Sequence, residues 1–143
     1  MTPAAYNQPP WRIVLVDAER AALWAEIAAG FRTALTGERR ERYLQRLEGF
    51  SGGVAVALVF VDLAVARELE TERGLSAEVA HSFVEQALGM VQLALWLAIA
   101  AEGLVTSLQH WDHLVGPRLA HFAALPETRF RLVATMPIGY ETG

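Results

Sequence analysis

Residues 87–101 read ALGMVQLALWLAIAA and form the longest apolar stretch in a chain of 143 residues. Gln92 is the one polar side chain in this stretch. A helix with apolar residues nearly all round is typical of a helix that protein covers on every side. The stretch is shorter than the ~20 apolar residues that a membrane span needs. We therefore expect a buried central helix over about residues 77–102, capped by Ser76 and ended by Gly103.

Short apolar runs elsewhere in the chain predict a sheet of about four strands. These runs are residues 12–16, 54–61, 105–110 and 130–135. The run at 54–61 reads VAVALVFV and does not alternate with polar residues, so both faces of its strand should be covered. We expect this strand to lie at the centre of the sheet.

Helices are expected between the strands. Besides the central helix, three helices are expected over residues 18–35, 38–48 and 63–74. Asp17 and Asp62 are placed to cap the first and third of these helices. A further short helix should start at Asp112 and halt near Gly116 and Pro117. This element order predicts an α+β fold with three layers, helix, sheet and helix, in one domain over residues 1–143.

Composition excludes several kinds of chemistry. Hydrophobic residues make up 53% of the chain, more than in an ordinary soluble domain, which indicates burial between subunits. The net charge of −4 gives no overall attraction to nucleic acid or anionic lipid. All 12 basic residues are arginine and cysteine is absent, which excludes lysine Schiff bases, thiolate nucleophiles and disulfides. The polar N-terminus resembles no secretion signal, so a cytoplasmic protein is expected.

Polar side chains form few recognisable catalytic groupings. The HWDH segment at residues 110–113 could hold a metal such as zinc or iron, but hydrogen-bonded histidines at a strand end are the favoured interpretation. His81 and Glu85 are interpreted as a surface pair on one helix. The arginines in residues 38–48 alternate with glutamates, which is typical of a solvated helix. No metal site, nucleophile elbow, P-loop or dinucleotide fingerprint is predicted.

Four segments, in sequence order, resemble the FMN-dependent nitroreductase family. Residues 2–12 (TPAAYNQPPWR) are similar to the family's loop P-S-S-x-N-x-Q-P-W, and residues 85–104 to its long central helix. Residues 106–112 (TSLQHWD) and 132–139 (LVATMPIG) are similar to the motifs S-L-Q-H-Y-N and L-x-A-Q-M-P-F-G of one branch. That branch holds small nitroreductase-like proteins, among them fungal proteins linked to fatty-acid signalling and bacterial stress-induced oxidoreductases.

The resemblance implies a central sheet flanked by helices in two intertwined subunits, with the long helix at the dimer interface and FMN bound there. It also implies that the N-terminal loop of one subunit touches the flavin, while the strand end after the central helix approaches the ring from the other side. The implied cofactor-binding residues are Pro3, Ala4, Ala5, Asn7, Ser107, Leu108, Gln109 and His110. Asn7 is the strongest of them, because its amide both donates and accepts. No catalytic side chain is assigned, since the flavin carries the chemistry.

Family members usually carry further segments at both ends. The segment before the loop holds arginines that grip the FMN phosphate, and a tail after the last motif wraps the partner subunit. Three interpretations stay open for this chain. It is a fragment of a longer reading frame, or another arginine such as Arg12 or Arg118 substitutes, or the protein has lost its cofactor.

The leading functional hypothesis is an NAD(P)H-dependent FMN oxidoreductase of the nitroreductase type. It acts as a homodimer on nitroaromatics, quinones or similar small aromatic acceptors, with no nucleic-acid or membrane partner. One alternative is a non-catalytic dimer of the same fold that binds no flavin. Another is a module that binds a small molecule in the vacated flavin pocket. Leu95 on the central helix is the predicted interface residue, and its change to glutamate should break the dimer.

Overall fold

Four antiparallel strands form one sheet in the order β1-β2-β4-β3 within residues 2–141, which the computed structural model describes. The strands are β1 Trp11–Val16, β2 Ala55–Asp62, β3 Val105–Thr106 and β4 Phe130–Gly139. Since β2 and β4 lie at the centre, β1 and β3 form the two edges. The ends of the expected domain, residue 1 and residues 142–143, lie outside the described residues.

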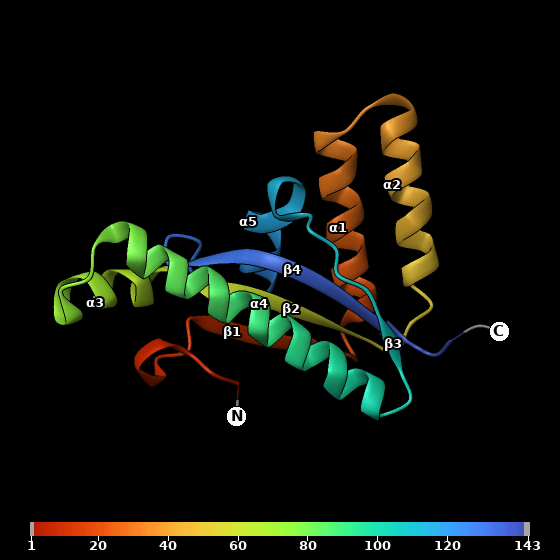
Figure 1. The fold of residues 1–143 in the computed structure, drawn as a ribbon. Coiled ribbons are helices and arrows are strands. Elements are labelled where there is room, and N and C mark those ends of the chain that lie inside the picture. The colour runs from red at the N-terminus through yellow and green to blue at the C-terminus, as the bar shows by residue number, and fades with distance from the viewer. Residues whose placement is uncertain (1, 142–143) are drawn as a thin grey trace.

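Helices cover both faces of this sheet and give the three predicted layers (Figure 1). They are α1 Arg20–Ala34, α2 Gly37–Phe50, α3 Leu63–Arg73, α4 Ala77–Ala101 and α5 Asp112–Phe122. Helices α3 and α4 pack on one face, and α1 and α5 pack on the other. Helix α2 pairs with α1 in a hairpin that projects from the sheet (Figure 1). The α+β fold class is therefore confirmed.

Strand β2 is apolar throughout because its two faces are buried in different layers. Val56, Leu58 and Phe60 pack in the layer of α1 and α5. Ala57 and Val59 pack against α4 on the other side. Side chains of a strand alternate between faces, so a strand between two helical layers needs no polar positions. The unbroken run VAVALVFV correctly indicated a central strand.

Strand β4 changes faces at a bulge. Its register with β2 shifts between Val59 and Phe60, which leaves Val133 without a partner in the ladder. Leu132 therefore packs in the α1 and α5 layer, whereas Ala134 packs in the α4 layer. The strand also continues past its predicted end, because its pairing with β2 and β3 extends over the Met-Pro-Ile-Gly segment.

Strand β3 is shorter than the sequence predicted. Val105 and Thr106 pair with β4, and Gln109 adds one isolated bridge to Thr135. The register places Pro137 opposite the residue where the ladder stops. Proline has no N–H to donate, so the ladder loses a hydrogen bond there. The prediction of a continuous strand over this segment is wrong for that reason.

Several predicted helix boundaries are confirmed. Ser76 begins α4 by accepting a hydrogen bond from Val79 N at 3.2 Å. Gly103 follows the end of that helix with φ +74°, a left-handed conformation that suits glycine. Asp62 begins α3 by accepting from Ala64 N at 3.1 Å.

Two other boundary predictions are wrong. Asp17 does not cap α1, which begins after Glu19 without a side-chain cap, and the Asp17 carboxylate accepts from the adjacent Ala18 N–H instead. Helix α5 does not halt at Pro117 but continues through it. Leu119 and its neighbours on α5 are buried against α1 and β4. That burial outweighs the one backbone hydrogen bond that proline removes.

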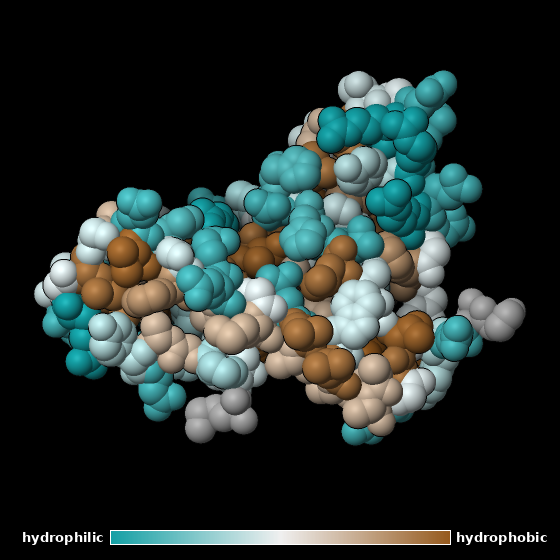
Figure 2. Space-filling model, viewed as in Figure 1, coloured by the Kyte–Doolittle hydropathy of each residue, from teal (hydrophilic) through white to brown (hydrophobic). Residues whose placement is uncertain are grey.

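Helix α4 is covered on one side only. Val91, Leu95 and Ile99 pack against the sheet, whereas Leu93 and Leu97 are each 60% exposed. Figure 2 shows apolar atoms gathered along this helix on the surface of the molecule. The prediction of a helix buried all round is therefore wrong for a single chain.

Among the described residues, α4 is also the one helix whose length and composition would allow it to cross a membrane. Its most apolar window has a mean hydropathy of 1.6 and is 22% buried. The helix has 25 residues and therefore extends beyond the apolar stretch at residues 87–101 that we judged too short for a membrane span. Length and composition are weak evidence for a span, and the covered side of α4 already packs against the sheet.

Candidate functional site

The loop before β1 has an uncommon backbone conformation. Tyr6 and Asn7 have φ of +53° and +56°, in the left-handed region that non-glycine residues seldom adopt. Two backbone hydrogen bonds of 3.1 Å close the turn, from Asn7 N to Ala4 O and from Gln8 N to Ala5 O. The Asn7 side chain is exposed, so its amide is available to a ligand.

Helices α3 and α4 hold this loop. The Gln8 side chain enters a narrow slot between them, where its Oε1 is buried without a hydrogen-bond partner among the described residues. The guanidinium carbon of Arg73, at the end of α3, lies 4.9 Å from the centre of the Tyr6 ring. Pro3 of the loop and Met90 of α4 together line a shallow hollow of about 430 Å³. The loop is therefore fixed beside the uncovered side of α4.

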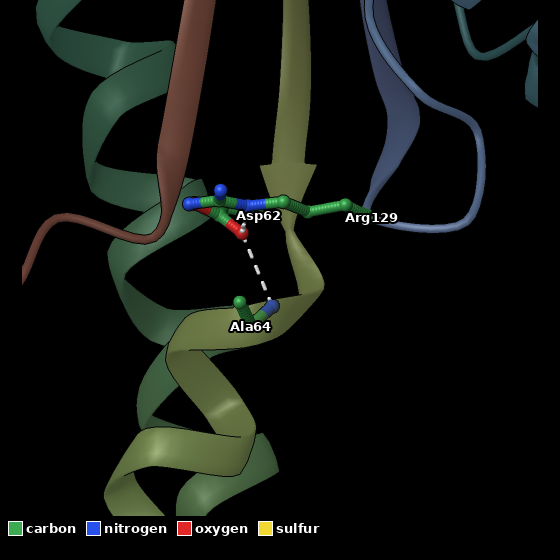
Figure 3. A network of polar contacts seen from close by, with 3 residues as sticks. All are labelled: Asp62, Ala64 and Arg129. Atoms are coloured by element: carbon green, nitrogen blue, oxygen red, sulfur yellow. Dashed lines mark hydrogen bonds and ion pairs between the residues drawn. The ribbon is translucent and has the colours of Figure 1, made fainter.

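An ion pair anchors the base of the loop (Figure 3). Arg129 donates to both carboxylate oxygens of Asp62, from Nε at 2.9 Å and from Nη2 at 2.8 Å. The Asp62 backbone N–H donates to the Pro10 carbonyl at 2.7 Å. The Arg129 hydrogen bonds hold the pKa of the Asp62 carboxyl below its ordinary value of 3.8, although burial acts to raise it. Asp62 thus joins three elements: its backbone N–H holds the loop, and its carboxylate holds the start of α3 and the entry to β4.

The second predicted segment lies along the outer edge of the sheet. Gln109 exchanges two backbone hydrogen bonds of 2.9 Å with Thr135, and its Nε2 donates to Ser107 Oγ at 3.0 Å. Adjacent residues of an antiparallel pair point their backbone groups to opposite sides, so those of Leu108 and His110 face the open edge. The Leu108 side chain packs in the α4 layer, and His110 is exposed. This edge offers backbone donors and acceptors to a ligand.

A cavity of about 270 Å³, here called the Ser107 cavity, opens beside this edge. Ser107 lines it from the edge, Gly49 lines it from the end of α2, and Gly52 lines it from the turn between α2 and β2. A Cβ at Gly53 of this turn would lie 2.5 Å from the Ile138 carbonyl oxygen. Glycine therefore lets the turn approach β4 closely enough to form the cavity. The sequence GFSGG indicated a turn but did not mark it as part of a site.

The two predicted segments lie apart within one chain. The hollows lined by Pro3 and by Ala5 both lie along α4 and include Met90. They share no lining residue with the Ser107 cavity. One chain therefore does not bring all of the predicted cofactor-binding residues together.

Neither arginine suggested as a phosphate contact lies at the Ser107 cavity. Arg118 Nη1 pairs with Glu26 Oε2 at 3.3 Å, between α5 and α1. The Arg12 guanidinium lies 5.0 Å from the centre of the Phe130 ring, and its strand is at the opposite edge from β3. Two strands separate those edges, a distance of about 14 Å. Within one chain, neither arginine therefore lines the Ser107 cavity.

The histidine groupings are surface pairs. His113 Nδ1 lies 3.9 Å from Asp112 Oδ1, and His81 Nε2 lies 3.8 Å from Glu85 Oε1. These side chains are all about half exposed or more. Over residues 2–141, no three histidine or carboxylate side chains gather to hold a metal ion.

Solved structures share this fold over nearly its whole length. The nitroreductase CinD from Lactococcus lactis, in complex with nicotinic acid, superposes with a TM-score of 0.87 and is 28% identical, over 100% of this chain and 73% of CinD. A nitroreductase from Saccharomyces cerevisiae superposes with a TM-score of 0.74 over 99% of this chain and 75% of the yeast chain. At 22% identity, this second likeness supports the fold alone.

Sequence comparison gives a consistent result. The yeast protein HBN1, whose name marks it as a provisional nitroreductase of Saccharomyces cerevisiae, is 27% identical over 128 residues. That match covers 89% of this chain and 62% of HBN1, so the chain spans less than two thirds of that relative. The model of the nitroreductase family matches residues 1–140. On this match, and with the fold that accompanies it, the chain belongs to the nitroreductase family.

Proposed function

We propose that two copies of this chain bind FMN between them and pass hydride from NAD(P)H to small aromatic acceptors. The observation that carries the proposal is the uncovered apolar side of α4. The Asn7 loop contacts this helix, and β3 contacts it near the Ser107 edge. A second copy that packs its own α4 antiparallel on this side brings its edge segment toward the loop of the first. The two segments that lie apart in one chain then flank one space.

The uncovered side of α4 has the spacing of a helix-pairing seam. The seam residues recur at alternating intervals of four and three: Val79, Phe83, Gln86, Met90, Leu93 and Leu97. Such a seven-residue repeat is typical of helices that pack along each other. Leu95 was the predicted interface residue, but it packs against the sheet. We therefore assign the interface to the seam, with Leu93 and Leu97 as its most exposed apolar members.

The residues at the sheet edge fit the ring of a flavin. The pyrimidine part of a flavin presents alternating hydrogen-bond donors and acceptors, and the backbone of Leu108 and His110 offers both kinds. Thr106 Oγ1 and Thr135 Oγ1 are buried nearby without a partner in the described residues. Buried hydroxyls are usually hydrogen-bonded, so the edge has polar capacity that its own chain does not use.

In this assembly the flavin supplies the hydride chemistry. The edge of one copy would hold and orient the ring, and the Asn7 amide of the other copy would reach it from the opposite side. CinD has been solved with nicotinic acid, with chloramphenicol and with 4-nitrophenol. These aromatic compounds support an aromatic acceptor for this chain as well.

Titration with FMN tests the proposal. The purified protein should be yellow, or should gain a flavin absorbance band and thermal stability when FMN is added. At a hundredfold excess over Kd, the expected stabilisation is about 2.7 kcal/mol. A colourless protein whose melting temperature does not change when FMN is added would contradict the proposal. Sedimentation analysis would then separate a flavin-free dimer from a protein that does not dimerise.

A further inference from the structure

The hairpin of α1 and α2, which projects from the sheet (Figure 1), has a groove between its two helices, here called the Trp24 groove. Its volume is about 590 Å³, within the range of small-molecule sites, roughly 300–1,000 Å³. Ala25 and Ala28 line it from α1, and Leu44 and Leu47 line it from α2. These four side chains are apolar, and the two alanines are too small to fill the space between the helices. The groove therefore offers an apolar floor.

A buried hydrogen-bond donor belongs to the wall of this groove. Trp24 lines the groove and is 7% exposed. Its indole Nε1 is buried and has no acceptor among residues 2–141. Buried donors in folded proteins are nearly always hydrogen-bonded, because an unpaired donor loses its water and gains nothing in return. The Trp24 N–H is thus a donor for which the described chain supplies no partner.

A carboxylate lies at the same end of the groove. Trp24 and Glu48 stand at equal distances in sequence from Thr36, where the two helices connect, so the antiparallel hairpin brings them level with each other. Glu48 lines the groove, is exposed and forms no ion pair within the described part of the chain. Nearer the connection, Arg32 and Glu41 line the groove with opposite charges. The Trp24 end therefore combines one unpaired donor with one negatively charged acceptor.

We propose that the Trp24 groove binds a small molecule that carries a carboxamide group on an apolar body. The oxygen of a carboxamide accepts hydrogen bonds and its nitrogen donates them. The oxygen accepts from Trp24 Nε1, and the nitrogen donates to the Glu48 carboxylate. The apolar body lies on the alanine and leucine side chains of the floor. A ligand carboxylate would meet the like charge of Glu48, and an amine has no acceptor for the Trp24 N–H.

This groove is separate from the proposed flavin site. It shares no lining residue with the Ser107 cavity. Trp24 and Leu47 belong to the layer of α1 and α5, on the other side of the sheet from the packed side of α4. The pairing of two copies along the α4 seam therefore does not use the groove. The inference goes beyond the proposed function and does not depend on flavin binding.

The first experiment is an NMR titration of the ¹⁵N-labelled full chain with benzamide. The indole N–H signal of Trp24 should move downfield, because its proton gains an acceptor, and the backbone signals of Ala25 and Ala28 should move with it. The signals of Ser107 and Thr135 should stay in place. Signals at Trp24 that do not move, or signals that move at the Ser107 cavity instead, would overturn the inference.

Matched probes test the chemistry of the ligand. Acetophenone keeps the benzene ring and the acceptor but has no donor, benzylamine keeps a donor but has no acceptor, and benzoate is negatively charged. Acetophenone and benzylamine should each bind about 2- to 10-fold more weakly than benzamide, and benzoate should bind most weakly of the four. Benzoate that binds as tightly as benzamide would contradict the carboxamide assignment.

Variants test the two polar contacts separately. Trp24→Phe removes the donor, so it should weaken benzamide about 2- to 10-fold and leave benzylamine unchanged. Glu48→Gln removes the charge, so it should narrow the difference between benzamide and benzoate about two- to fivefold. A benzamide-to-benzylamine ratio that Trp24→Phe leaves unchanged would remove the donor from the site.

A further pair of variants tests the space itself. Ala28→Leu fills the groove and should abolish the benzamide shifts, whereas Ala22→Leu, at an exposed position of α1 outside the groove, should leave them unchanged. Circular dichroism and the melting temperature show whether each variant is folded, and the series of probes on the unmodified chain decides the inference if Ala28→Leu does not fold. A folded Ala28→Leu that binds benzamide as before would overturn the inference. None of these outcomes changes the result of the FMN titration, so the two proposals fail separately.

Discussion

The two helical layers differ in how completely one chain covers them. On one face of the sheet, Leu23, Ile27 and Phe31 of α1 are each 0% exposed. On the other face, Val91 of α4 is 3% exposed, yet Leu97 of the same helix remains 60% exposed. Both layers pack on the same central strands, β2 and β4. The first layer is a finished core, whereas the second presents an apolar side to its surroundings.

The difference between the two layers shows where the chain carries its high content of hydrophobic residues. Hydrophobic residues make up 53% of the chain, and the helix from Ala77 to Ala101 carries exposed apolar side chains that a closed core would not need. Large exposed apolar patches on soluble proteins usually mark an interface. The open layer therefore behaves as half of a core, with the other half expected from a second copy.

The largest effect is expected for Leu97→Glu on the seam, which tests whether a second copy covers the open layer. Full burial of a leucine contributes about 1.5–3 kcal/mol, and a dimer has two such residues, so the association free energy should fall by about 3–6 kcal/mol. We expect a folded monomer, measured by sedimentation equilibrium and circular dichroism. The control Leu95→Glu puts the charge against the sheet and should unfold the chain. A variant at Leu97 that still dimerises with unchanged affinity would contradict the open-layer interpretation.

A core substitution tests the closed layer. Phe31 packs edge-on against Tyr43 and Trp111, with ring centres 5.3 and 5.2 Å apart. Phe31→Ala should lower the free energy of unfolding by about 3–5 kcal/mol, because it leaves a cavity in a finished core. Urea denaturation measures this loss, which should be the same in the Leu97→Glu monomer as in the unmodified protein. A loss that disappears in the monomer would mean that the two layers are not independent.

The Asp62–Arg129 pair should stabilise the protein in a pH-dependent way. Its carboxyl has a lowered pKa in the folded chain, so its stabilisation is present above pH ~4 and is lost as the pH falls through the lowered value. Asp62→Asn should lower the free energy of unfolding at pH 7 by about 1.5–3 kcal/mol. The difference from the unmodified protein should shrink in acid. Glu26→Gln, which breaks the exposed pair with Arg118, is the control and should cost less than about 1 kcal/mol.

The smallest expected effect is at the loop beside the open layer. Asn7→Ala removes one amide from the proposed flavin contact, which should raise the Kd for FMN about 2- to 10-fold. Flavin fluorescence measures the change, and Gln45→Ala on α2 is a matched amide control away from the loop. Equal Kd values for both variants and the unmodified protein would remove Asn7 from the site.

Sequence alone predicted the features that depend on neighbouring residues. The unbroken run at 54–61 gave the central strand, and the caps at Ser76 and Asp62 gave the starts of two helices, because each depends on contacts within a few residues. The family resemblance also named the Asn7 loop and the Ser107 edge as candidate site segments. Short motifs shared with a family can therefore nominate candidate segments without coordinates.

The features that sequence missed depend on residues far apart in the chain. Arg129 and Asp62 are separated by 67 positions, and nothing in either local segment predicts that they meet. The Ser107 cavity depends on a close approach of Gly53 to Ile138, which only the packed sheet makes visible. The pattern of apolar residues also could not show that half of α4 stays uncovered, because it is the same for a helix buried within one chain and for a helix buried between two chains.

The bulge in β4 makes the length of that strand as important as its composition. Leu132 serves one layer and Ala134 the other, although their positions in the strand have the same parity. Deleting Val133 would make Leu132 and Ala134 neighbours on opposite faces, as they already are, so every later residue of the strand would keep its side and its partner in β2. A single-residue deletion between Ala134 and Ile138, where the pairing is regular, has no extra residue to absorb it and would send the later residues of the strand to the other face. A segment grafted from a relative must therefore match the length of this strand beyond the bulge, whereas the bulged residue itself can be lost.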